Sequence, residues 1–210
     1  MTARLIETAD DIAEGCAWLS AHEPRFAEAL SATGPPPLRR RPGGFGALLN
    51  AICAQQLSTS AAEAVWLRLC DAGANCPRAI RSIDDETLRA CGLSRPKVRY
   101  ARALSDADLD YDALAVMPEP DAVAALTAVK GIGSWTAEIY LMFSIGRADV
   151  FACGDLALQE ATRVLFDLDA RPDEKAMRTI AADWSPWRGV AARLLWAYYR
   201  VITNRKGIVD

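Results

Sequence analysis

Apolar residues recur at helical spacing along most of the chain. In "FGALLNAICAQQ", Leu48, Leu49 and Ile52 fall on one face of a helix, and in "STSAAEAVWLRLCDAG" Val65 and Leu69 do the same. No pair of alternating segments predicts neighbouring strands, and no tandem repeat is visible. The pattern therefore predicts an all-α protein.

Residues that start or stop helices divide this pattern into elements. Ser58 and Asp84 are expected to be N-caps, Gly92 a left-handed helix end, and Pro96 part of a first turn. The proline- and glycine-rich segment "TGPPPLRRRPGG" excludes a regular element and is expected to link two helical lobes. The other helices are expected over residues 10–21, 24–32, 111–116, 121–129, 135–145, 156–165, 173–184 and 187–202.

Residues 121–145 are expected to form a helical hairpin with the turn Gly131-Ile132-Gly133. Glycine permits a tight turn, and amides at the N-terminus of the second helix can bind an anion such as a duplex phosphate. Ile132 would anchor the turn in the core. A plain helical hairpin with a glycine C-cap has the same pattern, so this motif alone leaves both interpretations open.

The composition narrows the class of protein. The 210 residues carry a net charge of -3, and no apolar run reaches the roughly 20 residues that a membrane-spanning helix needs. The first residues are partly acidic and lack an apolar signal region, which indicates the cytoplasm. Six scattered cysteines without C-x-x-C spacing argue against a zinc site or an iron–sulfur cluster, and the single His22 excludes most histidine-based triads.

The hairpin and the residues after it resemble the helix-hairpin-helix, Gly/Pro-rich, Asp (HhH-GPD) superfamily of base-excision DNA glycosylases. The segments "ICAQQLSTSAA", "CGLSRPKVRYARALS" and "WSPWRGVAARLLWAYY" are similar to the DNA-3-methyladenine glycosylase II (AlkA-type) branch, in the same order. The superfamily pattern L-x-x-[IVL]-x-G-[IV]-G-x-x-T-A, followed by V-F-x-x-x-D, is matched by Leu126, Val129, Gly131, Ile132, Gly133, Thr136, Ala137, Val150, Phe151 and Asp155.

This resemblance implies two helical lobes with the active site in the cleft between them. Residues 42–145 would form a helical barrel lobe that includes the hairpin at about 121–145. Residues 1–41 and 146–210 would form the second lobe, which carries Asp155. Because only about 40 residues precede the barrel, the resemblance implies a compact member without the extra N-terminal α/β domain of larger relatives.

By motif position, Asp155 is the catalytic carboxylate. It would stabilise an oxocarbenium-like sugar and orient or deprotonate water, and its place at a helix N-terminus favours the charged form. Asp155 could also serve only as an N-cap for "LALQEATRVLF", and the two roles are compatible.

The resemblance also assigns aromatic residues to the base pocket, since aromatic faces attract a cationic alkylated base. Trp135 and Trp196 match pocket positions, whereas Ile139, with Tyr140 beside it, replaces a pocket aromatic of larger relatives. Trp187 is equally compatible with the pocket and with core packing. Bifunctional relatives have a nucleophilic lysine where this chain has Trp135, so we expect hydrolysis without strand cleavage.

Several further residues are expected to contact DNA. In the hairpin, the residues expected to contact DNA are Lys130, Gly131, Ile132, Gly133, Ser134 and Thr136. In the basic segment they are Arg95 and Lys97, although solvated surface charge explains this segment equally well. Gln55, Gln56 and Leu57 are the candidates for the side chain that fills the space left by a flipped base. A structural Na⁺ or K⁺ could bind the carbonyls of Thr127, Val129 and Ile132 when DNA is bound; no cofactor is otherwise expected.

The sequence therefore predicts a monofunctional DNA glycosylase acting on alkylated purines such as 3-methyladenine. Its partner would be damaged double-stranded DNA, and no obligate protein partner or membrane is evident. The protein would lie in the cytoplasm, associated with the nucleoid through DNA. The alternatives are a non-catalytic helix-hairpin-helix DNA-binding module and a glycosylase of the same fold for deaminated or oxidised bases.

Overall fold

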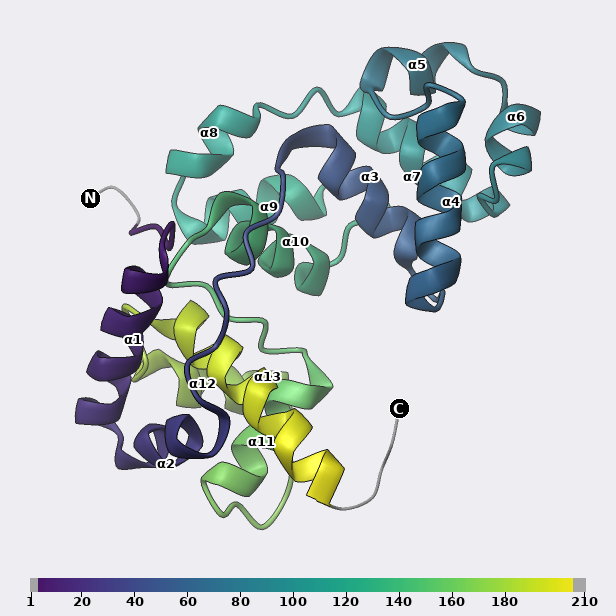
Figure 1. The fold of residues 1–210 in the computed structure, drawn as a ribbon. Helices are drawn as coiled ribbons and strands as arrows, with labels where there is room; N and C mark the ends of the chain where they lie inside the picture. The colour runs from purple at the N-terminus through teal and green to yellow at the C-terminus, as the bar shows by residue number, and fades with distance from the viewer. Residues whose placement is uncertain (1–3, 206–210) are drawn as a thin grey trace. The chain divides into compact units, whose positions relative to one another are not determined.

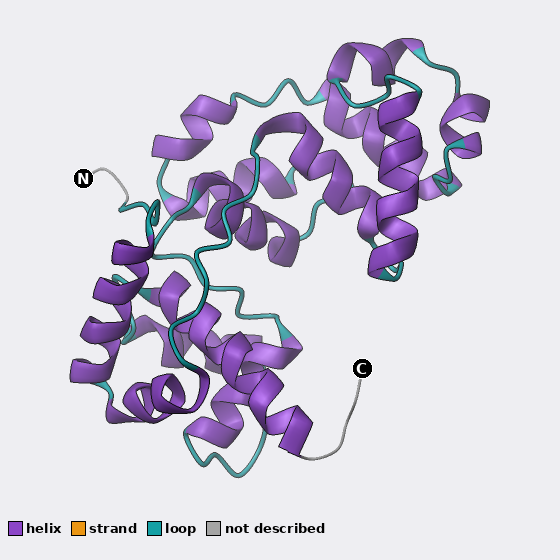
Figure 2. Ribbon diagram, in the orientation of Figure 1, coloured by secondary structure: helices purple, strands orange, loops and turns teal. Residues whose placement is uncertain are grey.

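The computed structural model describes residues 4–205, and within them the chain is helical, as predicted (Figures 1 and 2). The described residues form thirteen α-helices and one π-helix, with a single isolated bridge between Leu5 and Arg147. The chain divides into two compact units. We call Met1–Arg40 with Leu141–Asp210 the terminal unit, and Arg41–Tyr140 the central unit.

The central unit is built around α3, whose Leu48, Leu49 and Ile52 are completely buried. Helix α3 packs against α4, α7 and α10, while α5 and α6 pack against α7. Ser58 and Asp84 accept main-chain N–H groups of the helices that follow them, as the sequence predicts. The helices of this unit are α3 (Gly44–Ala54), α4 (Thr59–Asp71), α5 (Pro77–Ser82), α6 (Asp85–Ala90), α7 (Arg95–Asp106), α8 (Tyr111–Val116), α9 (Glu119–Thr127) and α10 (Ser134–Tyr140).

The terminal unit is organised around its last helix, α13, which packs against α1, α2 and α11. A cluster of aromatic rings, formed by Phe26, Phe151, Phe166 and Trp184, fills its core with mostly edge-on contacts. The helices of this unit are α1 (Ala9–His22), α2 (Pro24–Thr33), the π-helix η1 (Leu141–Ile145), α11 (Leu156–Leu165), α12 (Glu174–Ala182) and α13 (Arg188–Arg205).

The helix expected over residues 135–145 is where the structure differs most from the prediction. Its first part is α10, but Leu141–Ile145 form a π-helix, in which the Leu141 carbonyl accepts the N–H groups of Gly146 and Arg147 at 3.0 and 2.9 Å. The carbonyl of Met142 accepts Nη2 of Arg193 at 2.9 Å. The wider turn is therefore stabilised from outside the segment, by a residue distant in the sequence.

The segment between α2 and α3 has no regular element, as the proline and glycine content predicts. The six-residue helix α5 was not expected; Pro77 starts it at a first-turn position. No helix of the described residues is long and apolar enough to cross a membrane.

Candidate functional site

Asp155 caps the N-terminus of α11. Its Oδ1 atom accepts the main-chain N–H groups of Ala157 and Leu158, both at 3.0 Å. The same oxygen accepts Nε1–H of Trp196, which reaches it from α13 at 3.2 Å. Three N–H donors on one carboxylate oxygen, together with the helix dipole, stabilise the negative charge of this side chain.

The backbone that leads into Asp155 is fixed by buried neighbours. Val150 and Phe151 are buried in the core of the terminal unit, and the side-chain amide of Gln159 donates to the Cys153 carbonyl at 2.9 Å. The half-buried carboxylate therefore follows a segment whose backbone is held by buried side chains and by the Gln159 hydrogen bond.

An ion pair that the sequence analysis missed holds the start of this segment. Asp149 accepts Nε of Arg188 at 2.7 Å and the hydroxyl of Ser185 at 2.7 Å, and its main-chain carbonyl accepts Nη2 of Arg188 at 2.8 Å. These bonds connect the beginning of α13 to the segment that carries Asp155. The sequence carries no local signal for this pair, because 39 residues separate the partners.

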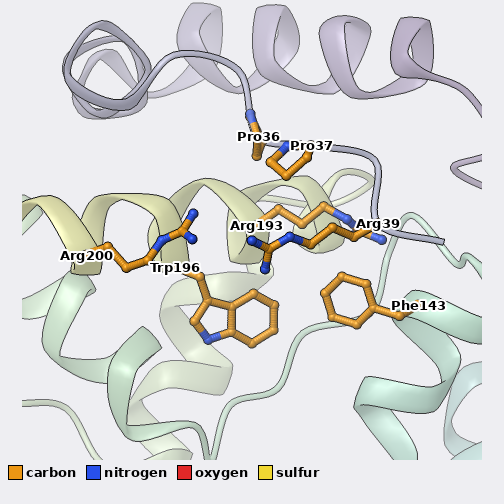
Figure 3. Close-up of a pocket in the computed structure, with 7 residues that line it drawn as sticks. All are labelled: Pro36, Pro37, Arg39, Phe143, Arg193, Trp196 and Arg200. Atoms are coloured by element: carbon orange, nitrogen blue, oxygen red, sulfur yellow. The ribbon is translucent and has the colours of Figure 1, made fainter. Parts of the chain in front are cut away.

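Beside Trp196 lies a small pocket that is partly open to solvent (Figure 3). Arg193 lies over the ring of Phe143, with the guanidinium carbon 4.6 Å from the ring centre, and the rings of Phe143 and Trp196 are 5.8 Å apart. We call this the arginine pocket; its lining residues are Pro36, Pro37, Arg39, Phe143, Arg193, Trp196 and Arg200.

Arg193 is the buried charge of this pocket, with 4% of its surface exposed. Burial, and secondarily the positive charge of Arg40, lower the pKa of Arg193 to about 10. Its Nη atoms donate to the carbonyls of Gly189 and Met142. Of the lining residues, only Trp196 was expected from the sequence to be a site residue, because the others come from distant parts of the chain.

The expected hairpin is present as α9, the glycine turn and α10. Gly131 has a φ of +99°, and an added Cβ would lie 2.3 Å from Cγ of Tyr100, so both backbone conformation and space require glycine. Ile132 is buried, as expected, and its N–H donates to the Val129 carbonyl at 3.0 Å. Gly133, Ser134 and Lys130 are exposed, and Thr136 is half-buried.

The structure distinguishes the three candidates for the inserted side chain. The amide of Gln55 donates to the Gly131 carbonyl at 2.8 Å, and it thereby connects the end of α3 to the hairpin turn. Gln56 has a φ of +58°, a left-handed conformation that reverses the chain. Leu57 then follows with 40% of its surface exposed, so its side chain is accessible, and insertion into the duplex stays a prediction.

The two basic candidates on α7 differ in environment. Lys97 donates from Nζ to the Cys53 carbonyl at 2.7 Å, in the last turn of α3, and desolvation lowers the pKa of Lys97. Lys97 therefore has a structural role within the central unit. Arg95 is exposed, and its contact with DNA stays a prediction.

The candidates for the base pocket also differ in how far their side chains are exposed. Trp135 is 48% exposed, whereas Tyr140 is buried and its hydroxyl accepts the Gly44 N–H at 2.9 Å. Trp187 is 1% exposed and packs so closely on Gly15 that an added Cβ would lie 2.8 Å from its ring. Trp187 thus belongs to the core of the terminal unit, and we omit it from the substrate contacts. Ile139 is half-buried.

Residues 49–186 match the HhH-GPD superfamily of base excision DNA repair proteins. The alkylbase DNA glycosidase-like protein mag2 of Schizosaccharomyces pombe is 26% identical over 201 residues, which cover 90% of this chain and 93% of the relative. The DNA-3-methyladenine glycosylase 1 of the same organism is 31% identical, covering 71% of this chain and 69% of the relative.

The chain is also similar in fold to solved structures of DNA glycosylases. DNA-3-methyladenine glycosidase from Bacillus halodurans matches with a TM-score of 0.83 and 29% identity, over 97% of this chain and 95% of that one. The S. pombe 3-methyladenine DNA glycosylase Mag1, in complex with abasic DNA, matches with a TM-score of 0.73 and 27% identity, over 87% of this chain and 95% of that one.

Proposed function

Since the chain belongs to the HhH-GPD superfamily of base excision DNA repair proteins, we propose that it is a monofunctional DNA glycosylase that releases alkylated purines such as 3-methyladenine from duplex DNA. The observation that carries this proposal is the carboxylate of Asp155, which accepts hydrogen bonds from the amides of α11 and from Nε1 of Trp196. The sequence motif assigns the catalytic aspartate to this residue. The names of the relatives support the choice of alkylated bases.

The reaction requires the damaged nucleotide to leave the stack. Extrusion costs a few kcal/mol, and an inserted side chain, for which Leu57 is the exposed candidate, would compensate by filling the space. A purine alkylated at N3 or N7 is cationic and already a good leaving group, so little acid catalysis is needed. The carboxylate of Asp155 would stabilise the positive charge that develops on the sugar and orient the attacking water.

Trp135, in the first turn of α10, bears on whether the reaction also cleaves the DNA strand. Strand cleavage by a bifunctional glycosylase requires an amine that attacks the sugar, and Trp135 offers none. Its exposed indole would instead stack on a base. The product would therefore be an intact strand with an abasic site.

The hairpin is proposed to bind the DNA backbone. The exposed amides around Gly133 and Ser134, at the start of α10, suit a phosphate, and Lys130 adds a positive charge. A Na⁺ or K⁺ would be held by the carbonyls of Thr127, Val129 and Ile132. The Val129 carbonyl already accepts the Ile132 N–H, which holds the turn closed and leaves its second lone pair for such an ion. We propose that the protein acts in the cytoplasm on nucleoid DNA.

The proposal is tested by base release from duplexes that each carry one lesion: 3-methyladenine, 7-methylguanine, hypoxanthine or ethenoadenine. We expect release of the alkylated bases, with strands that stay intact until alkali is added. Preferential release of hypoxanthine would favour the alternative of a glycosylase for deaminated bases. Binding to all duplexes without any release would favour the non-catalytic DNA-binding module.

A further inference from the structure

Three guanidinium groups meet in the arginine pocket, and they come from two distant parts of the chain. Arg193, Trp196 and Arg200 follow one another at helical spacing and share one face of α13. Arg39 approaches from the segment after α2, beside Pro36 and Pro37 (Figure 3). No acidic residue lines the pocket.

The positive charge of this pocket is not neutralised by the protein. Among the described residues, Arg39, Arg193 and Arg200 form no ion pair with a carboxylate within 4.0 Å. Arg193 is 4% exposed, and its Nε has no hydrogen-bond partner. Buried charges are normally paired, so a buried guanidinium without a carboxylate indicates that an external anion complements it.

The backbone at Arg39 supports the same conclusion. Its φ is +48°, in the left-handed region that arginine adopts only at an energetic cost and that glycine or asparagine adopts more easily. Pro36 and Pro37 restrict the preceding backbone, so the segment presents Arg39 to the pocket with little conformational freedom. Strained residues of this kind concentrate at ligand-binding positions.

We propose that the arginine pocket binds a phosphate group, and that in the working protein this group is a backbone phosphate of bound DNA. Guanidinium groups match phosphate oxygens in charge and in bidentate geometry. The pocket shares Trp196 with the site: the indole ring lines the pocket, and its Nε1 donates to Asp155. A phosphate held here would therefore lie near the nucleotide whose sugar Asp155 acts on. The existence of the anion site is independent of the proposed activity, whereas its assignment to DNA rests on that activity.

The test uses the variant Arg39→Gln/Arg200→Gln, which removes two exposed charges and leaves buried Arg193 in place. The control Arg171→Gln/Arg178→Gln removes the same charge from exposed positions of the same unit that do not line the pocket. Binding to a duplex with a stable abasic analogue is measured against salt concentration. Inorganic phosphate is titrated separately into the free protein, with the Trp196 indole N–H resonance as the signal. Neither measurement requires base release, so failure of the catalytic proposal would not affect them.

The slope of log K against log[salt] is negative, and we expect the pocket variant to reduce its magnitude by about 1, the contribution of one phosphate contact. The control should leave the slope unchanged. We also expect phosphate to shift the indole resonance in the natural protein but not in the pocket variant. A lost phosphate response with an unchanged slope would overturn the assignment to DNA and identify a site for free phosphate. An unchanged slope and no phosphate response in the natural protein would overturn the proposal entirely.

Discussion

The indole Nε1 of Trp196 donates a hydrogen bond to Oδ1 of Asp155 at 3.2 Å, although 41 residues separate them in the chain. The bond connects α13 to the N-terminus of α11, two helices that pack together in the terminal unit. Trp196 thus contacts the carboxylate directly, and it also lines the arginine pocket.

Replacing Trp196 by phenylalanine should slow base release by about tenfold to a hundredfold. The aromatic ring is kept, but the N–H donor is lost, and a hydrogen bond to a charged group contributes roughly 1.5–3 kcal/mol. The rate is measured in single-turnover experiments on methylated duplex DNA. Trp18→Phe is the matched control, because Trp18 stacks on His22 in α1. Equal rates for both variants would show that the indole N–H does not act on Asp155.

Replacing Gly131 by alanine should lower the free energy of unfolding by about 1–3 kcal/mol, because the φ of +99° is strained for alanine and the new Cβ would collide with Tyr100. The affinity for DNA should fall as well, because the displaced turn would no longer present its amides to the DNA backbone. Gly133→Ala is the control for stability, because no atom lies within 4 Å of its added Cβ. The measurement is chemical denaturation of both variants, and similar stabilities would contradict the described turn.

Leu57→Ala and Gln55→Ala should have different effects. Without the Leu57 side chain the space left by a flipped base stays empty, so base release should fall from duplex DNA and change little from single-stranded DNA. Gln55→Ala removes the bond to the Gly131 carbonyl and should weaken binding to both substrates through the hairpin. Base-release rates and DNA affinities of both variants are measured on duplex and on single-stranded DNA. A duplex-specific defect in Gln55→Ala alone would reassign the inserted side chain.

Alkaline pH should destabilise the protein through Cys53. Burial raises the pKa of the Cys53 thiol to about 12 from an ordinary value of 9.0, so the folded state keeps a proton that the unfolded state loses. The stability from this group is complete below about pH 9 and is lost as the pH rises toward 12. At about pH 10.5 the loss is on the order of 2 kcal/mol. Denaturation at pH 8 and pH 10.5 should show a smaller pH dependence for Cys53→Ala; an equal dependence would exclude this cause.

Local sequence signals predicted the helices well because their causes are local. Apolar spacing placed α3 and α4. Ser58 and Asp84 cap helices with their side-chain oxygens, and Gly92 has a positive φ that the absence of a Cβ permits. The π-helix could not be predicted, because Arg193, far along the chain, stabilises its Met142 carbonyl. Local patterns decide helix boundaries, whereas such contacts depend on packing.

In the candidate site too, the features set by local sequence could be predicted, whereas those set by the packing of distant segments could not. The position of Asp155 came from its motif, and its cap bonds to Ala157 and Leu158 follow from its place before α11. The arginine pocket was not predicted, because Arg39 and Arg193 are brought together only by the packing of the terminal unit. Trp187 could not be assigned from sequence, since core and pocket tryptophans have the same local pattern.

The central claim is that the carboxylate of Asp155 performs the chemistry, and the most direct measurement is base release from 3-methyladenine duplexes by Asp155→Asn. The side-chain oxygen that caps α11 is kept, whereas the negative charge is lost. Asp173→Asn is the matched control, because Asp173 caps α12 in the same unit. We predict that Asp155→Asn loses at least about 100-fold in rate with DNA affinity largely retained, and that Asp173→Asn keeps its rate. Full activity of Asp155→Asn would contradict the account.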